Sequence, residues 1–531
     1  TTFAGTARSR AIVTCDPADR VVRGDSAVDL LSQVAEPGPV GAGGSSVQLD
    51  LMSTEELATY GAAGFALFGK TSFGHVVHRL ERYHAAKTPE DKRTHALKLI
   101  EHIQAWEKSD SRNTLDPTKK AADEKKAEGL KKLKLQATTE AEFIRMKSDQ
   151  VQPEANPRLH TIQVGDQSVM PRMVASTAPL FGDNEPSMDG IKQGALGDCW
   201  LLAGLGALVN KDPGYIKGMM TDNGTSVTVR LFDDKGPKFI KVNKEVPKVA
   251  VPDPSSSSGG TRDVDTFAKG NLWVQMIEKA VAVHMQSYKS TEGSKGNIAF
   301  SVLTGSGGTK LTNTADMRRK PWPGGGNSDG GKTEDVMCKK VAVQALGDTD
   351  AATWWAFATK YRPQLTSAQT LEAVQKVATD HAEEIDASIV QTLGAFLKTQ
   401  NLLPGRMGSG NYSRSQMDAW SFITKGLSSG ALMSAGTNAS IGDSEGSGGS
   451  GEAKVKGMAG GHQYTLLATK TDERGRNWIQ VRNPWGRYSR EYDEAEDGTL
   501  TAKAKGGEGD NGQSWIELSD FCAMFGNDVY K

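Results

Sequence analysis

The sequence QGALGDCWLL, residues 193–202, joins a glycine-containing turn to an apolar run that continues to Val209. The length of this run and its small residues predict a buried helix that begins near Cys199. At a helix N-terminus the unpaired backbone N–H groups and the positive end of the helix dipole favour a thiolate over a thiol. A lone free cysteine is nevertheless most often a small buried apolar residue, so a reactive role for Cys199 requires partner side chains.

Two candidate partners lie towards the C-terminal end of the chain, each next to a predicted strand. His462 follows two glycines and precedes the apolar run 465–468, whereas Asn483 follows a second predicted strand at 478–481. If these strands are neighbours in one sheet, the amide of Asn483 lies beside the imidazole of His462. A Cys, a His and an Asn brought together supply the nucleophile, the base and the orienting group of thiol-dependent acyl transfer.

Three motifs therefore have a shared chemical meaning, and in chain order they are QGxLGDCW (193–200), GHxY (461–464) and RNPWG (482–486). Together they resemble the catalytic core of the calpain family of cysteine proteases. The resemblance covers roughly residues 175–531 and points to a bacterial member. It implies an α+β, papain-like fold in which a helical subdomain carries the cysteine and a β-rich subdomain carries the histidine and the asparagine. Further segments similar to the family are 271–282, 303–305 and 514–525.

The resemblance assigns roles to residues within these motifs. Cys199 is the expected nucleophile, His462 the base, and Asn483 the group that holds the imidazole in line. The side-chain amide of Gln193 and the backbone N–H of Cys199 resemble the oxyanion hole of this protease class. Trp485 matches a tryptophan that shields the Asn–His hydrogen bond and obstructs the cleft until the two halves rotate together. A plain core tryptophan is the alternative.

Substrate and metal contacts are also expected from the resemblance. Gly305 and Gly461 are placed to let a substrate backbone lie close, which favours extended protein or peptide substrates. Calpain cores bind calcium through carboxylates and carbonyls, which makes Glu278 and Asp189 candidate calcium ligands. Asp189 is shifted from the usual position of the acid before the first motif, and residues 487–490, RYSR, lack the acids that are usual there. We therefore expect one calcium site at most, and no cofactor in the chemistry itself.

Composition argues against several other functions. The 531 residues contain 63 Lys and Arg against 64 Asp and Glu, a net charge of −1 that argues against a nucleic-acid partner. Four scattered cysteines without CxxC pairing predict neither a disulfide framework nor a zinc site. No apolar run is long enough to cross a bilayer and no signal-peptide pattern opens the sequence. We expect a protein without membrane insertion, either cytoplasmic or delivered as an effector.

Changes in composition and periodicity divide the chain into six parts. The N-terminal module shows three stretches of helical periodicity, and a delivery or regulatory protein is its expected partner. The connector behind it is a candidate site of cleavage by the protease itself. The insertion is either a regulatory or substrate-selecting element or a plain elaboration. The parts are a flexible segment (1–50), the helical module (51–148), the connector (149–184), the Cys-bearing subdomain (185–306), the Gly-rich and helical insertion (307–412) and the His- and Asn-bearing subdomain (413–531).

These features together predict a cysteine endopeptidase, and two other classes stay open. A transglutaminase-like thiol acyltransferase uses a similar triad, but the pair GHxY and NPWG is typical of calpains. A non-catalytic scaffold with a protease fold is the second alternative, and the retention of the triad and of Gln193 argues against it. The Gly- and Ser-rich run 442–451 is expected to form a flexible loop beside the cleft.

Overall fold

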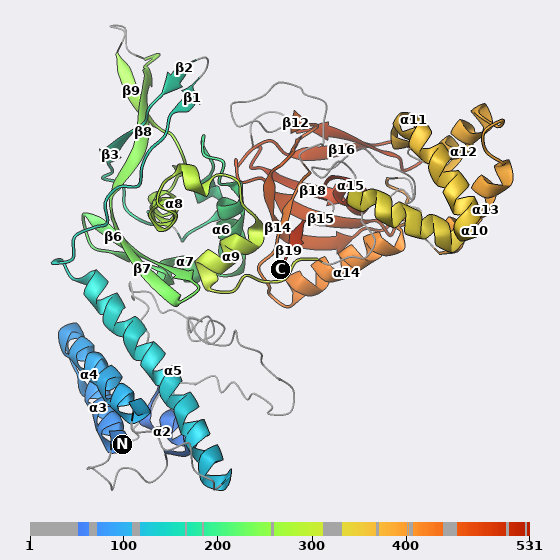
Figure 1. Cartoon of the computed structure of the whole chain (residues 1–531). Helices are drawn as coiled ribbons and strands as arrows, with labels where there is room; N and C mark the ends of the chain where they lie inside the picture. Colours follow the sequence, from blue (N-terminus) through green and yellow to red (C-terminus); the bar gives the residue numbers. More distant parts are fainter. Residues whose placement is uncertain are drawn as a thin grey trace, which may run out of the picture.

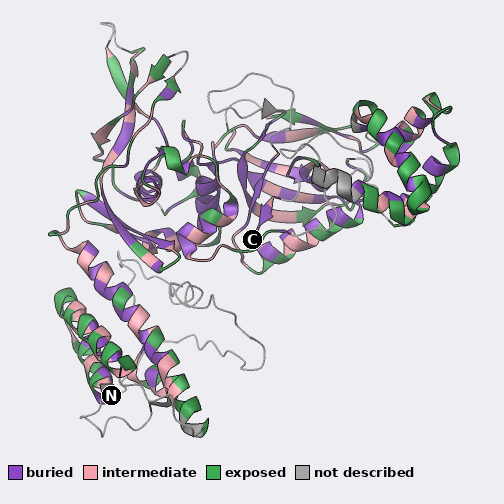
Figure 2. Cartoon of the chain, in the orientation of Figure 1, coloured by how far each residue is buried: buried purple, intermediate pink, exposed green. Residues whose placement is uncertain are grey.

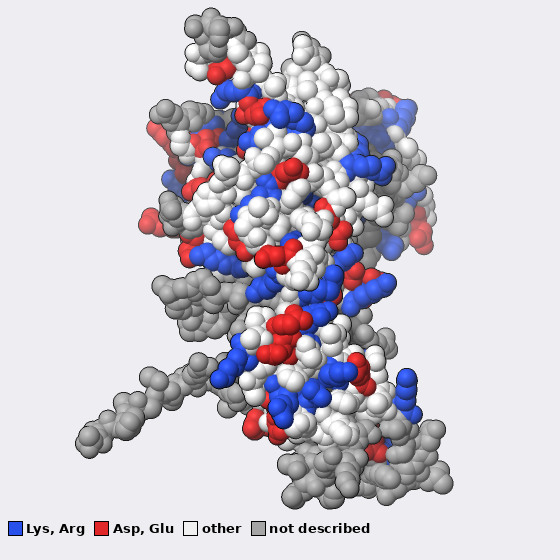
Figure 3. Space-filling model, turned by 90° about the vertical axis from the view of Figure 1, so that its left-hand side faces the viewer, with Lys and Arg blue, Asp and Glu red and all other residues white. Residues whose placement is uncertain are grey.

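The computed structural model shows a helical N-terminal module, two halves packed against each other, and a helical insertion at the far end of the second half (Figure 1). Among the described residues no helix is both long and apolar enough to cross a membrane. Basic and acidic side chains are interspersed on the face drawn in Figure 3, in keeping with the net charge of −1. The structure describes residues 51–62, 72–108, 117–164, 167–182, 185–255, 260–311, 332–367, 371–400, 402, 407–438, 454–505, 509–525 and 528–531.

Two predictions lie outside the described residues. They are the flexible segment 1–50 and the glycine- and serine-rich loop 442–451.

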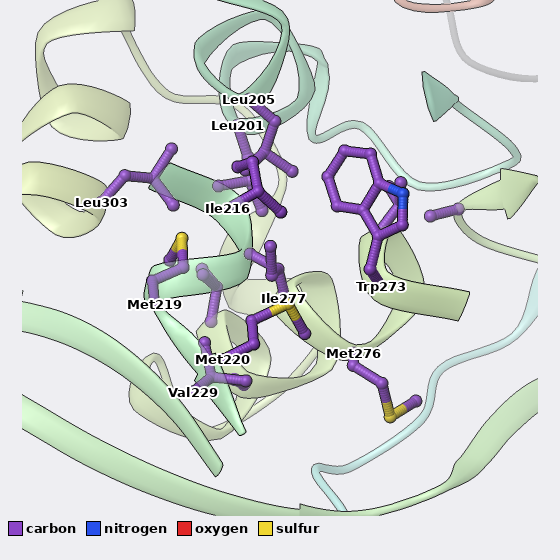
Figure 4. Close-up of a cluster of buried hydrophobic side chains, with 14 of the residues drawn as sticks. Leu201, Leu205, Ile216, Met219, Met220, Val229, Trp273, Met276, Ile277 and Leu303 are labelled. Atoms are coloured by element: carbon purple, nitrogen blue, oxygen red, sulfur yellow. The ribbon is translucent and has the colours of Figure 1, made fainter. Parts of the chain in front are cut away.

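The Cys-bearing half packs helices against small sheets. Its elements are η3 (Met188–Gly190), β4 (Ile191–Lys192), α6 (Cys199–Lys211), α7 (Pro213–Gly218), β5 (Met220–Asp222), β6 (Ser226–Asp233), β7 (Gly236–Asn243), β10 (Lys269–Gly270), α8 (Leu272–His284), η4 (Lys289–Thr291) and α9 (Gly296–Thr304). Helices α6 and α8 are buried along most of their length (Figure 2). Apolar residues cover every side of α6, whereas α8 also buries the polar side chains of Gln275, Glu278 and Lys279. In Figure 4, Leu201 of α6 and Ile277 of α8 lie in one core with Val229 of β6. The helix predicted after Cys199 is confirmed by α6, and β6 and β7 form an antiparallel hairpin.

The N-terminal module is a bundle built on the predicted apolar stripes. Its elements are α2 (Thr54–Leu57), the π-helical turn η1 (Ala58–Ala62), α3 (Ser72–Ala85), α4 (Pro89–Lys108) and α5 (Pro117–Lys147). Leu80, Leu99 and Leu133, one from each long helix, are buried in a shared core. The three predicted stretches of helical periodicity form α3, α4 and α5, and α5 is the longest of them with 31 residues.

The last turn of α5 anchors the module on the β6–β7 hairpin. Phe143 packs against Phe239 of β7 with ring centroids 5.0 Å apart. The hydroxyl of Thr228 in β6 donates a hydrogen bond to the carbonyl of Met146 at 3.1 Å. The module is therefore attached through side-chain packing and hydrogen bonds as well as through the chain.

The segment predicted as a connector carries strands of its own. Strands β1 (Ile162–Val164) and β2 (Gln167–Val169) form a small hairpin. Strand β3 (Arg172–Ala175) pairs antiparallel with β8 (Glu245–Pro252), whose other neighbour is β9 (Thr261–Asp265). This segment therefore contributes a strand to a sheet of the Cys-bearing half.

The insertion forms a separate helical unit. Its helices are α10 (Lys332–Lys360), α11 (Arg362–Ser367), α12 (Leu371–Asp380) and α13 (Ala387–Thr399). One face of α13 packs in a core of the insertion, in which Ile389 and Leu393 are buried with Trp354 of α10. In Figure 1 the helices α11–α13 lie on the side of the second half away from α6.

The His- and Asn-bearing half is a five-stranded sheet covered by helices. Its elements are α14 (Arg414–Ser428), β11 (Ser434–Gly436), β12 (Lys454–Val455), β13 (Met458–Ala459), β14 (Gln463–Thr471), β15 (Asn477–Arg482), β16 (Arg490–Glu494), β17 (Leu500–Ala504), β18 (Gln513–Glu517), α15 (Leu518–Phe525) and β19 (Val529–Tyr530). The strand order of the main sheet is β18-β15-β14-β11-β19. Strands β14 and β15 are neighbours, as the sequence predicts for the segments beside His462 and Asn483.

Candidate active site

Cys199 is the first residue of α6, and its side chain is almost entirely buried, with 8% of the residue exposed. Helix α6 lies directly on strand β14: the hydroxyl of Thr465 donates to the carbonyl of Ala203 at 2.8 Å. A glycine is required for this approach, because a Cβ on Gly206 would lie 2.4 Å from the Thr465 Oγ1 atom. The small residues that predicted a buried helix therefore set how closely the two halves meet.

His462 and Asn483 are held together by strand pairing. In the β14–β15 ladder Thr465 lies opposite Arg482, which brings the start of β14 beside the end of β15. The Nε2 atom of His462 lies 2.9 Å from Oδ1 of Asn483, and both side chains are buried. Because a carbonyl oxygen only accepts, Nε2 carries the hydrogen, and Nδ1 is then the acceptor nitrogen of the neutral ring.

A second contact fixes the direction of α6 relative to β14. The side-chain amide of Asn210 donates to the carbonyl of Leu467 at 3.4 Å. Because both contacts occur in the same order along the two elements, α6 and β14 run in the same direction from the Thr465–Ala203 contact. Cys199 lies about one turn, roughly 6 Å, before Ala203, and His462 lies just before Thr465, so both precede the contact on the same side. This arrangement places the thiol and the imidazole at the same end of the interface between the halves.

Gln193 lies beside the turn that leads into α6. Its side-chain Nε2 donates to the carbonyl of Leu196 at 2.7 Å, which fixes the plane of the amide. Its backbone N–H donates to the carbonyl of Pro484 at 2.9 Å. An amide nitrogen has two hydrogens, so the second N–H remains available to a ligand. The residue is buried, and its backbone bond ties it to the segment that carries Asn483.

Trp485 packs against the ring of His462. Its indole lies 4.7 Å from the ring of His462, measured between centroids, and its backbone N–H donates to Oδ1 of Asn483 at 3.0 Å. The residue is half-buried. Contact with both members of the pair favours the predicted shielding role over a plain core tryptophan.

The two predicted substrate-binding glycines have separate positions. Gly461 directly precedes His462 and has a φ of +64°, which a residue with a side chain rarely adopts. Gly305 ends α9 with a φ of +80°, so its helix-capping conformation already accounts for a glycine there. No hydrogen bond described in the structure connects Gly305 with Cys199, His462 or Asn483.

A buried carboxyl pair that the sequence did not predict lies directly beside Cys199. Asp198, the residue before Cys199, is fully buried, and so is Glu278 of α8. The backbone N–H of Ala268 donates to Oε1 of Glu278 at 2.8 Å. Burial, and next the negative charge of Asp198, raise the pKa of Glu278 well above its usual value. The only sequence signal was the acidic residue inside GDCW.

The two predicted calcium ligands, Asp189 and Glu278, lie in different surroundings. Asp189 sits in η3, whose flanking carbonyls on Met188 and Ile191 both accept hydrogen bonds from the guanidinium of Arg482. Among the described residues, neither belongs to a group of three His, Cys, Asp or Glu side chains with ligand atoms within 4.8 Å of one another. Calcium takes six to eight oxygens, and Arg482 already occupies the carbonyls of Met188 and Ile191, so a calcium site at Asp189 or Glu278 stays a prediction.

None of the three described cysteines, Cys199, Cys338 and Cys522, forms a disulfide. The one described group with metal-binding spacing is His381, Glu383 and Glu384 in the insertion. There Glu384 already accepts hydrogen bonds from the Lys360 ammonium and the Tyr361 hydroxyl.

Comparison with known proteins agrees with this geometry. Residues 169–323 and 355–529, together more than half of the chain, match the family described as calpain family cysteine protease. Among curated proteins, the chain is similar to the calpain-type cysteine protease DEK1 of Zea mays, with 29% identity over 143 residues. That match covers 26% of this chain and 6% of the maize protein, so the chain spans a small part of that relative's length.

Proposed function

Because the chain belongs to the calpain family of cysteine proteases, we propose that it is an endopeptidase that cleaves peptide bonds with Cys199, His462 and Asn483. The observation that carries the proposal is the buried His462–Asn483 hydrogen bond of 2.9 Å, at the end of the interface where α6 begins with a thiol. A buried imidazole oriented by an amide has the geometry of a general base rather than that of a surface histidine.

The chemistry follows from the positions of these groups. Nδ1 of His462 takes the proton from the thiol of Cys199, and the start of α6 stabilises the resulting thiolate. The sulfur attacks the peptide carbonyl carbon, the C–N bond breaks, and the imidazolium gives its proton to the leaving amine. A water molecule then loses a proton to His462 and attacks the thioester, which releases the acid and regenerates the thiol.

The negative oxygen that forms in each half of the reaction requires donors on the Cys-bearing side. The backbone N–H of Cys199 and the second amide hydrogen of Gln193 are the candidates, because Leu196 already fixes the amide plane. Gly461 leaves space beside His462, which suits an extended polypeptide as the substrate. No step in this scheme requires a metal.

Self-processing is the regulatory part of the proposal. The segment between the N-terminal module and the nucleophile is paired to the Cys-bearing half from Glu154, whose N–H donates to the carbonyl of Lys241 at 2.7 Å, through β3. Cleavage in its unpaired parts would remove the covalent link between the helical module and the protease core, and would leave only the contacts of Phe143 and Met146 with the β6–β7 hairpin.

The proposal is tested by labelling with an epoxysuccinyl inhibitor of thiol proteases under reducing conditions. We expect a single modification at Cys199, none at the buried Cys522, and none at all in a His462→Ala variant because the thiolate depends on the imidazole. Mass spectrometry of digested protein identifies the labelled residue. Absence of label on Cys199, with and without added calcium, would remove the protease assignment.

A further inference from the structure

Arg482 is a buried arginine at the boundary between the two halves. It is the last residue of β15, and only 1% of it is exposed. Its Nη2 atom donates hydrogen bonds to the carbonyl of Met188 and, at 2.9 Å, to that of Ile191. A guanidinium removed from water is costly unless hydrogen bonds replace its hydration, so these two carbonyls determine where the side chain can lie.

The two carbonyls belong to the Cys-bearing half, whereas the arginine belongs to the other half. Met188 is the first residue of the turn η3 and Ile191 directly follows the turn, and the negative charge of Asp189 within it favours the cation. Burial lowers the pKa of Arg482 to about 10, which still leaves the guanidinium charged at neutral pH. The contact therefore joins residues about 290 positions apart in the chain through a charged donor and two fixed acceptors.

The residues that follow Arg482 touch the catalytic groups of both halves. Asn483 accepts from His462, and the carbonyl of Pro484 accepts from the backbone N–H of Gln193 at 2.9 Å. Three consecutive residues thus contact the turn of η3, the imidazole and the candidate oxyanion residue. A shift of this segment would move the base relative to the oxyanion donors.

We propose that Arg482 is a positioning residue that fixes the alignment of the two halves, and through it the placement of His462 relative to Gln193 and Cys199. This inference rests on the proposed peptidase function. Arg482 itself touches no reacting atom. Loss of Arg482 should lower kcat by misplacing the reacting groups, because a misplacement of about 1 Å between them costs on the order of 10²-fold in rate.

The test compares Arg482→Met, Arg482→Lys and a control, Arg474→Met, in purified full-length protein. Arg474 lies in the turn between β14 and β15, is largely exposed and pairs with Glu494 at 2.9 Å, so its loss removes an arginine from the same hairpin without touching the site. Hydrolysis of a fluorogenic peptide is measured, and kcat is divided by the concentration of active sites titrated with the epoxysuccinyl inhibitor. This division removes the contribution of misfolded protein.

We expect Arg482→Met to lose about 10-fold to 10²-fold in kcat per titrated site with KM changed less than about threefold. Arg482→Lys should recover part of the loss, since an ammonium can also donate to two carbonyls, and Arg474→Met should match the wild type. A kcat per site within about twofold of wild type for Arg482→Met, or a lysine variant no better than the methionine variant, would overturn the inference. If the methionine variant does not fold, the lysine variant decides: reduced kcat per site at wild-type Tm supports the role, and wild-type kcat overturns it.

Failure of the underlying function would look different. A wild-type protein that neither cleaves peptides nor takes the inhibitor at Cys199 would contradict the proposed function before any arginine variant is compared.

Discussion

Replacing Gly206 by alanine is expected to separate the helix that carries the thiol from the strand that follows the histidine. The added Cβ would lie 2.4 Å from Thr465 Oγ1, whereas Cβ contacts under 3.0 Å are essentially never seen, so the two elements must move apart by at least about 0.6 Å (3.0 − 2.4). Overpacking of this kind costs about 1–3 kcal/mol, and the better helix propensity of alanine offsets up to about 1 kcal/mol. We expect the free energy of unfolding to fall by about 1–2 kcal/mol.

The same displacement should reduce catalysis. It moves Cys199 relative to His462 by a large part of 1 Å, and a misplacement of that size costs on the order of 10²-fold in rate. We therefore expect kcat to fall by about 10-fold to 10²-fold while KM changes little. Urea unfolding and initial rates on a fluorogenic peptide measure the two effects separately.

A second substitution makes the test specific to this contact. Thr465→Ala removes the oxygen that the new methyl group would meet, and the nearest remaining neighbours, Thr465 Cβ at 3.4 Å and Met188 Sδ at 3.5 Å, are at ordinary distances. Alone, it loses one hydrogen bond to Ala203, worth about 1 kcal/mol. The double variant should therefore be more stable and more active than Gly206→Ala. Our reasoning fails if Gly206→Ala behaves as wild type, or if the double variant is no better than the single one.

Four further outcomes are expected. Gln193→Ala should lose about 10²-fold to 10³-fold in kcat with little change in Tm, as measured by steady-state kinetics and thermal unfolding, and near-wild-type turnover would refute the oxyanion role. Purified wild-type protein should shorten between about residues 110 and 185 on storage while Cys199→Ala stays intact on gels and by mass spectrometry; equal shortening of both would point to a contaminating protease. A calcium chelator should leave peptide hydrolysis within about twofold of the untreated rate, because the carbonyls beside Asp189 already bind Arg482, and loss of activity that added calcium restores would contradict this. The pKa of Glu278 is higher in the folded protein than in the unfolded chain, so the folded protein keeps a proton that the unfolded chain releases. The free energy of unfolding should therefore fall as pH rises from the usual glutamate pKa towards the raised one. Urea unfolding at pH 5 and pH 7 should show a smaller fall for Glu278→Gln than for the wild type, and equal falls would refute this role of Glu278.

Local patterns were sufficient to predict the elements that carry the site. The run after Cys199 is apolar on every side and contains glycines, which is typical of a helix packed on all faces, and α6 is such a helix. The strands beside His462 and Asn483 were predicted from short apolar runs, and they are neighbours in the sheet. The contact between His462 and Asn483 depends on this pairing alone. The two motifs next to these strands were therefore sufficient to predict it.

Contacts between distant parts of the chain were not predictable in this way. Strand β3 is mostly exposed and pairs with β8, more than seventy residues later, so no local alternation marks it. The sequence marks Arg482 only as the first residue of the RNPWG motif. It gives no signal for the hydrogen-bond acceptors of Arg482, because these are backbone carbonyls, which every residue has. Asp198 and Glu278 are far apart in the sequence, and their carboxyl groups meet only because α6 and α8 belong to one packed core.

The long helix α5 also limits how the N-terminal module can influence the enzyme. It contains 31 residues, which at 1.5 Å per residue make a rod of about 46 Å whose C-terminal turn is fastened to the β6–β7 hairpin. In Figure 1 the helices α2–α4 pack along this rod below the hairpin, away from the start of α6. While the anchor at Phe143 holds, the hairpin fixes the position of these helices relative to the Cys-bearing half. Any influence they have on the thiol must be transmitted through the hairpin, as a change in its position or rigidity.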